Sequence, residues 1–267
     1  MTIFDRLRPK KPKKAFYHLK VDEGKYQGLK LHLRFEEDGT GVLIINASRI
    51  LFLNQTAAEY VHSFIHGHSE EEAVKRIRKR YRIDAETARK DYQDVLFVVN
   101  TFAETPDVCP VSYLGVEKIE PFQKELSAPY RMDLAITYRC NNKCLHCYAG
   151  GPKETKELST QEWILIINKL FDLGIPQVVL TGGEPTLRDD LPALIAQTQK
   201  TGLVSGLVTN GRRLKDEPYF KSLVDAGLDH VQITLESHNP KIHDKITGVK
   251  GSWDETVLGL KNAIASP

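Results

Sequence analysis

The sequence predicts two domains, a small α+β domain followed by an α/β domain built on a parallel sheet. Three observations support this prediction. Strand-like segments near the N-terminus precede three segments of helical periodicity, a proline-bearing stretch without periodicity follows, and from Asp133 onward strands and helices alternate. With 267 residues, 41% of them hydrophobic, the chain is long enough to form two cores.

The composition excludes several classes of protein. Lys and Arg number 37 against 35 Asp and Glu, so a net charge of +2 gives no overall attraction to nucleic acid or anionic membranes. Residues 1–14 form a basic tail without an apolar run, and no later segment approaches the roughly eighteen apolar residues of a membrane span. Three of the 4 cysteines are clustered, unlike a secreted disulfide framework. We therefore expect a cytoplasmic protein.

The first domain is predicted to occupy residues 15–105. Residues 29–35 alternate apolar and polar side chains, and residues 41–46 and 49–53 continue as strands of a meander spanning roughly 17–53. Capping-box patterns beginning at Thr56 and Ser69 predict two helices, and a third begins near Asp84. The apolar stripes of the three helices are Ala57, Val61, Phe64 and Ile65, then Val74, Ile77 and Tyr81, then Ala88, Tyr92, Val95, Leu96, Val99 and Phe102.

Residues 106–132 are predicted to be a linker. The segment contains four prolines and no clear periodicity, and prolines remove amide donors and favour extended backbone. Cys109 lies in it and is either an extra metal ligand or a packed thiol. We place Cys109 outside the predicted site.

The second domain is predicted to span residues 133–267. Its strands are residues 134–138, 177–181, 203–208 and 230–235, each a short apolar run typical of buried parallel strands. Helices are expected after a capping box at Ser159 and Glu162, ending near Gly174, and at 191–200, 217–226 and 253–265. Four βα units in succession imply a right-handed parallel sheet, either open or part of a barrel.

Polar motifs follow each of these strands. Because the carboxyl ends of parallel strands meet at one edge of the sheet, these motifs are expected to share one pocket. Cysteines spaced as C-x-x-x-C-x-x-C can direct three thiolates from one loop to an inorganic centre. The motif residues in chain order are Cys140, Cys144 and Cys147, then Gly182, Gly183, Glu184 and Pro185, then Asn210, then Thr234 and Glu236.

The cysteine loop together with the Gly-Gly-Glu-Pro turn resembles the radical S-adenosylmethionine (SAM) superfamily over roughly residues 130–267, and in particular its peptide- and protein-maturing subgroup. The resemblance implies a partial (βα) barrel with four of the family's six βα units, so we expect the chain to lack the last barrel strands and a further cluster-binding domain. It also implies a 4Fe-4S cluster on Cys140, Cys144 and Cys147, with SAM at the open iron. Cleavage of SAM would yield a 5′-deoxyadenosyl radical.

The same resemblance implies roles for the remaining motif residues. Glu184 would bind the methionine amino group, Gly182 and Gly183 would permit close backbone approach, and Pro185 would fix the turn. His146 would pack near the adenine or would stabilise the loop. Thr234 and Glu236 would bind the ribose and Asn210 would line the same pocket, although all three also fit ordinary strand-end polar residues. No residue is assigned a catalytic role.

In the first domain, the segment Ile50-Leu-Phe-Leu-Asn-Gln-Thr-Ala57 with Gly67-His-Ser-Glu-Glu71 resembles the winged-helix peptide-recognition domain related to the pyrroloquinoline-quinone peptide chaperone. The resemblance implies that a precursor peptide adds a strand to the sheet edge beside the third helix. A winged domain of another purpose, including DNA binding, is the alternative, because residues 73–80 are basic. A solvated basic face explains that charge equally well.

The sequence therefore predicts a radical SAM enzyme that modifies a ribosomal peptide or protein. Its expected partners are the precursor peptide and a reductant such as ferredoxin or flavodoxin, with no nucleic acid and no membrane. One alternative is a radical SAM enzyme acting on a small-molecule cofactor or haem precursor. Another is a non-catalytic winged-helix binding protein with a structural metal loop.

Overall fold

The computed structural model describes residues 15–23, 27–104 and 126–266. The chain divides into two compact units, Met1–Pro129 and Tyr130–Pro267, and the division falls within the predicted linker. The basic tail, most of that linker and Cys109 lie outside the described residues. No helix among the described residues is both long enough and apolar enough to cross a membrane.

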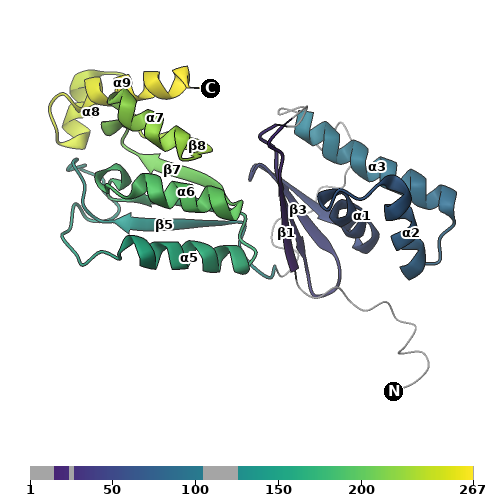
Figure 1. The fold of residues 1–267 in the computed structure, drawn as a ribbon. Helices are drawn as coiled ribbons and strands as arrows, with labels where there is room; N and C mark the ends of the chain where they lie inside the picture. The colour runs from purple at the N-terminus through teal and green to yellow at the C-terminus, as the bar shows by residue number, and fades with distance from the viewer. Residues whose placement is uncertain (1–14, 24–26, 105–125, 267) are drawn as a thin grey trace. The chain divides into compact units, whose positions relative to one another are not determined.

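The first unit contains an antiparallel sheet with the strand order β1-β2-β3-β4 (Figure 1). Its strands are β1 (Ala15–Lys20), β2 (Lys30–Phe35), β3 (Gly41–Ile45) and β4 (Arg49–Leu53). The predicted meander is confirmed, and β1 adds a further strand to it. In this order β1 and β4 are the edge strands of the sheet.

Three helices follow the sheet: α1 (Gln55–Ile65), α2 (Glu70–Arg80) and α3 (Ala85–Glu104). The capping box at Ser69 is confirmed, but the one predicted at Thr56 is wrong. Asn54 caps α1 instead, because its side-chain oxygen accepts the Ala57 amide at 2.8 Å. The helix therefore begins earlier than predicted, and Ala58 rather than Ala57 is buried.

The core of the first unit lies between the sheet and helices α1 and α3. Leu31, Leu33 and Leu43 from the strands pack with Val61 of α1 and Phe102 of α3. A smaller cluster joins the three helices and consists of Tyr60, Ala73, Ile77 and Tyr92.

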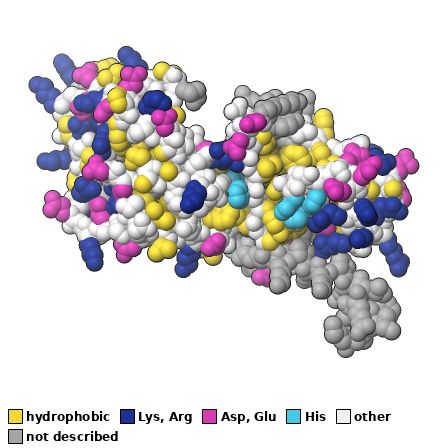
Figure 2. Space-filling view, in the orientation of Figure 1, with side chains coloured by type: hydrophobic (Ala, Val, Ile, Leu, Met, Phe, Trp, Pro, Cys, Tyr) yellow, Lys and Arg dark blue, Asp and Glu magenta, His cyan; other side chains and the backbone are white. Residues whose placement is uncertain are grey.

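On the surface of the first unit, Lys and Arg side chains lie beside Asp and Glu side chains (Figure 2). Two ion pairs among them, Arg80–Glu59 and Arg89–Glu70, have nitrogen–oxygen distances of 2.7 and 2.9 Å.

The second unit contains the predicted parallel sheet, and its strand order is β5-β6-β7-β8. Its strands are β5 (Arg131–Thr137), β6 (Gln177–Gly182), β7 (Val204–Thr209) and β8 (His230–Ile233). Helices α5 (Thr160–Asp172), α6 (Leu191–Thr201), α7 (Glu217–Asp225) and α9 (Ser252–Ala265) pack beside one another in chain order (Figure 1). Short 3-10 turns, η2 (Pro185–Leu187) and η3 (Arg213–Lys215), follow β6 and β7. The predicted capping box at Ser159 is confirmed.

Helix α8 (Pro240–Thr247) was not predicted. It has only 8 residues, which is too short to show a clear apolar period. The signals that could have found it are Asn239 at the N-cap, Pro240 at the first helical position and Gly248 in the left-handed conformation (φ 69°) at the C-terminal end.

Candidate active site

A cavity of about 220 Å³ lies at the carboxyl ends of the parallel strands. As predicted, it brings the strand-end motifs together. The predicted residues that line it are Cys140, Cys144, His146, Cys147, Gly182, Gly183, Asn210, Thr234 and Glu236. Glu184 and Pro185 do not line the cavity, and both residues are buried.

Helix α8 supports the cysteine loop. The amides of Lys143 and Leu145 donate to the carbonyls of Thr247 and Ile246 at 2.8 and 2.9 Å, so the end of the helix pairs with the loop backbone. Gly248 follows, and a Cβ there would come within 2.8 Å of the Lys143 carbonyl oxygen. The unpredicted helix therefore holds the loop in place.

The three cysteines carry free thiols, and the surroundings of Cys140 and Cys144 disfavour the unbound thiolate. Burial raises the pKa of the Cys140 thiol, and the neighbouring Glu184 carboxylate adds to the effect. Burial also raises the pKa of Cys144, with a further contribution from Glu236, while a hydrogen bond from Asn142 opposes the rise. A positive centre bound by the sulfurs would stabilise their ionised forms.

The donor set fits an iron-sulfur cluster. Within the described ranges, no group of three His, Cys, Asp or Glu side chains is positioned to hold a metal ion. In a 4Fe-4S cluster each thiolate binds its own iron, so the ligands need not converge on one ion. Three thiols from one loop, facing one cavity, provide three of the four positions of such a cluster.

The glycine pair brings the end of β6 against the end of β5. Gly183 and Glu184 donate their amides to the carbonyls of Thr137 and Arg139 at 2.7 and 2.8 Å. A Cβ at Gly182 (φ +135°) or at Gly183 would clash with these same two carbonyls. The two glycines thus allow the backbone that leads into the cysteine loop to lie close against the end of β6.

Glu184 is fully buried at 0% exposure, and neutral groups hold its carboxylate. Its Oε1 accepts the Thr186 amide at 3.1 Å and the hydroxyls of Thr186 and Thr209, both at 2.6 Å. Its Oε2 accepts the Asn210 amide at 2.8 Å. The carboxylate therefore fixes the end of β7 and the residue that lines the cavity next to it. Pro185 is the first residue of η2.

The remaining predicted residues form the rim. His146 Nε2 lies 3.3 Å from Glu236 Oε1, with side-chain exposures of 62% and 17%. The backbone amide of Glu236 donates to Nδ1 of His243, a buried residue of α8, at 3.2 Å. The Thr234 amide donates to the Thr209 carbonyl at 3.1 Å, which continues the pairing of β8 with β7.

Sequence reasoning missed two arginines that organise the site. Arg188, 6% exposed, donates Nη1 to the Ile136 carbonyl and to Glu157, each at 3.2 Å, and forms an ion pair with Asp190. Arg212 binds the cysteine loop and α9. Arg212 directly follows the Asn210-Gly211 turn in the sequence, and this position next to a predicted site residue could have indicated its role.

Comparison with known proteins supports the family resemblance of the second unit. Residues 134–266 match the model of the Radical SAM superfamily. Fe-coproporphyrin III synthase of Methanosarcina barkeri is 40% identical over 129 residues, which are 48% of this chain and 32% of that protein. PqqA peptide cyclase of Rhizobium meliloti is 37% identical over 130 residues (47% and 34%), and the probable GTP 3',8-cyclase of Methanopyrus kandleri is 36% identical over 133 residues (49% and 42%). The chain thus spans less than half the length of each of these relatives.

Solved structures share the fold over more of the chain. SuiB of Streptococcus suis bound to precursor peptide SuiA gives a TM-score of 0.55 at 15% identity, covering 89% of this chain and 52% of that one. SuiB bound to SAM gives 0.56 at 18% identity, covering 86% and 52%. At this identity the likeness shows a shared fold.

The radical SAM superfamily uses a 4Fe-4S cluster and SAM, and the relatives found here are synthases and cyclases, that is, enzymes. The cysteine loop, the parallel sheet and the family match agree with one another: residues 134–266 form a radical SAM domain.

Proposed function

We propose that the chain acts as a radical SAM enzyme on a ribosomally made peptide or protein. The observation that carries this proposal is the cavity at the strand ends, which is lined by the three free thiols, the glycine pair, Asn210 and Glu236. When bound, the cluster and SAM would supply a 5′-deoxyadenosyl radical that abstracts a hydrogen atom from the substrate.

The residues of this chain would hold and orient those groups. Cys140, Cys144 and Cys147 would bind three irons and leave the fourth open. Glu236, mostly buried at the rim, would accept hydrogen bonds from ribose hydroxyls, and His146 would help to orient it. Glu184, which we predict to attract the methionine amino group, also fixes the neighbouring Asn210.

The first unit supports a peptide substrate. Its edge strand β4 lies beside α3, where the Arg49 guanidinium sits 5.8 Å from the centre of the Phe102 ring and donates to the Phe102 carbonyl. Ile50 of β4 and Phe97 of α3 are 38% and 61% exposed. An edge strand with apolar side chains nearby suits a peptide that adds as a further strand. We propose that this unit is a winged-helix recognition domain for a precursor peptide.

Two comparisons favour the same proposal. PqqA peptide cyclase is named for a peptide substrate, and the SuiB structure contains a precursor peptide. A reductant such as ferredoxin or flavodoxin would deliver the electron. A small-molecule substrate is the second candidate, because the radical SAM domain is also 40% identical to a coproporphyrin synthase.

Anaerobic reconstitution with iron and sulfide tests the cluster. We expect about four irons and four sulfides per chain and a visible absorption band that Cys144→Ala weakens or removes. The matched control is Ser48→Ala, a change in the turn between β3 and β4 of the other unit, which is expected to keep the band. Tight zinc binding with no iron uptake would favour a structural metal loop and contradict the proposal.

Peptide binding to the full-length chain tests the first unit. Fluorescence anisotropy with short peptides encoded beside the gene should show binding that Ile50→Glu and Phe97→Glu both weaken. Leu165→Glu, a change of an exposed apolar residue (68%) in the second unit, is the control. Equal affinities in all four proteins would contradict recognition at the β4 edge, and turnover of a porphyrin precursor without peptide binding would favour the second candidate.

A further inference from the structure

Asn142 lies between two of the three thiols in the cysteine loop. Its backbone amide donates to the Cys140 sulfur at 3.4 Å. The residue is only 4% exposed, so this contact is shielded from water. The Asn142 amide is therefore a hydrogen-bond donor to one of the three sulfurs.

Arg212 determines how the Asn142 side chain is turned. Its Nη1 donates to Asn142 Oδ1 at 2.9 Å and to the Asn141 carbonyl at 2.6 Å. Because a guanidinium has donors and no acceptor, it fixes the oxygen of the Asn142 amide on its own side. Arg212 thereby holds both residues that follow Cys140 in the loop.

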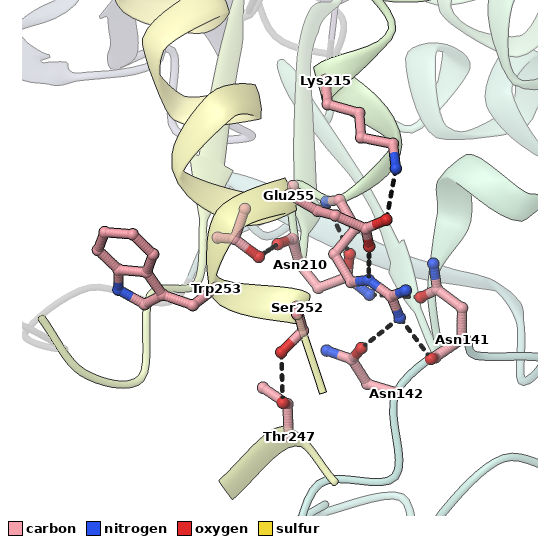
Figure 3. Close-up of polar contacts among 12 residues, drawn as sticks. Asn141, Asn142, Asn210, Lys215, Thr247, Ser252, Trp253 and Glu255 are labelled. Carbon is pink, nitrogen blue, oxygen red and sulfur yellow. Dashed lines mark hydrogen bonds and ion pairs between the residues drawn. The ribbon is translucent and has the colours of Figure 1, made fainter. Parts of the chain in front are cut away.

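Residues outside the cysteine loop hold Arg212 in turn. Its Nε donates to Glu255 Oε2 of α9 at 2.5 Å, and its backbone amide donates to Asn210 Oδ1 at 3.0 Å. Figure 3 shows the Asn141 carbonyl and the side chains of Asn142 and Glu255, which accept the hydrogen bonds of the Arg212 guanidinium. The first two belong to the cysteine loop and Glu255 belongs to α9. The Arg212 side chain is 15% exposed, so it is largely removed from solvent.

We propose that Arg212 is a positioning residue that, through Asn142, fixes the N–H···S hydrogen bond to the Cys140 thiolate and raises the reduction potential of the cluster. The inference rests on the proposed function. Hydrogen bonds to the sulfurs stabilise the more negative, reduced cluster, and they are among the determinants of iron-sulfur potentials. The arginine thus sets how readily the cluster accepts the electron.

An EPR-monitored redox titration of the reconstituted full-length protein, without SAM, tests this role. Asn142→Leu removes, at similar size, the side-chain oxygen that Arg212 holds, so the backbone amide is no longer fixed against the Cys140 sulfur. We expect about a tenfold lower ratio of reduced to oxidised cluster at a given applied potential, equivalent to about −59 mV for one electron. Arg212→Gln should shift the potential in the same direction, and Arg212→Lys, which keeps the charge and one donor, should recover part of the shift.

Lys215→Gln is the matched control, because Lys215 pairs with the same Glu255 but not with the cysteine loop. Its cluster should titrate as the wild type does. A wild-type potential in Asn142→Leu would overturn the inference and leave the proposed function standing. Failure of the wild-type protein to take up iron and sulfide would overturn both.

Discussion

Glu184 is the residue at which sequence and structure add different information. The sequence indicates a carboxylate in a strand-end turn, and the family resemblance assigns it to a ligand. The structure shows that the carboxylate is buried and accepts four hydrogen bonds from Thr186, Thr209 and Asn210. The residue is therefore part of the scaffold of the cavity as well as a predicted ligand contact.

Glu184→Gln tests the scaffold role. A glutamine amide has one acceptor oxygen, so at least one buried donor among these residues loses its partner, which costs about 1–3 kcal/mol. Urea unfolding of the cluster-free protein should show this loss for the second unit. Glu154→Gln, a change at an exposed position, is the control, and equal unfolding free energies in the two variants would contradict the role.

Asp190 makes the stability of the second unit depend on pH. The hydrogen bond from Arg188 lowers the pKa of this carboxyl, and partial burial opposes the effect without reversing it. Since the pKa is lower in the folded state, the stabilisation is complete above the unfolded pKa, about 3.9, and is lost as the pH falls through the folded value. Asp190→Asn should therefore lose less stability than the wild type between pH 7 and pH 3. Urea unfolding of both proteins at the two pH values measures this loss of unfolding free energy. An equal loss in both proteins would contradict the role of Asp190 in the pH dependence.

At the scale of elements, short segments position the cysteine loop. Helix α8 pairs with its backbone, and the Gly182-Gly183 turn fixes the strand that leads into it. Neither segment provides a sulfur ligand. The loop geometry thus depends on elements distant from it in sequence.

Asn239→Ala tests the contribution of α8. The Asn239 side chain accepts the amides of Lys241 and Ile242 at 3.0 and 3.3 Å, and loss of such a cap costs about 1 kcal/mol. Hydrogen exchange should become faster at the Lys143 and Leu145 amides, which bond to the end of this helix. Lys241→Ala, an exposed change in the same turn, should leave both rates near those of the wild type. Unchanged rates in Asn239→Ala would show that the loop is held without the helix.

At the scale of the whole molecule, each unit has buried hydrophobic residues of its own, Leu33 and Leu43 among those of the first and Leu180 and Leu207 among those of the second. Both tryptophans, Trp163 and Trp253, belong to the second unit. Tryptophan fluorescence therefore reports the unfolding of that unit, whereas far-UV circular dichroism reports the helices and strands of both.

Ile77→Ala should separate the two transitions. This residue is 1% exposed in the core of the first unit, and truncation of such a side chain costs about 2–5 kcal/mol. We expect part of the circular dichroism transition to move to lower urea concentration while the fluorescence midpoint stays unchanged. Leu207→Ala, a change of a fully buried residue in β7, should shift the fluorescence midpoint instead. A fluorescence shift in Ile77→Ala would mean that the units unfold together.

The order and type of most elements could be predicted from the sequence, because periodicity and capping residues are local signals. These signals correctly located the parallel sheet, the helices begun by Ser69 and Ser159, and the strand-end residues that share the cavity. They failed where two local signals competed, as at Asn54 and Thr56, and where a helix was too short to show a period, as for α8.

The sequence by itself determined which chemical groups are present: three thiols in one loop, a glycine pair, and polar residues after each parallel strand. Only the tertiary structure decided which of them line the cavity and which are buried in the interior, because burial depends on contacts between distant segments. It placed Glu184 in the interior, put α8 behind the cysteine loop, and joined Arg212 to Asn142 across 70 residues of sequence. Such contacts leave no periodic pattern in the chain, and so they become visible only in the folded protein.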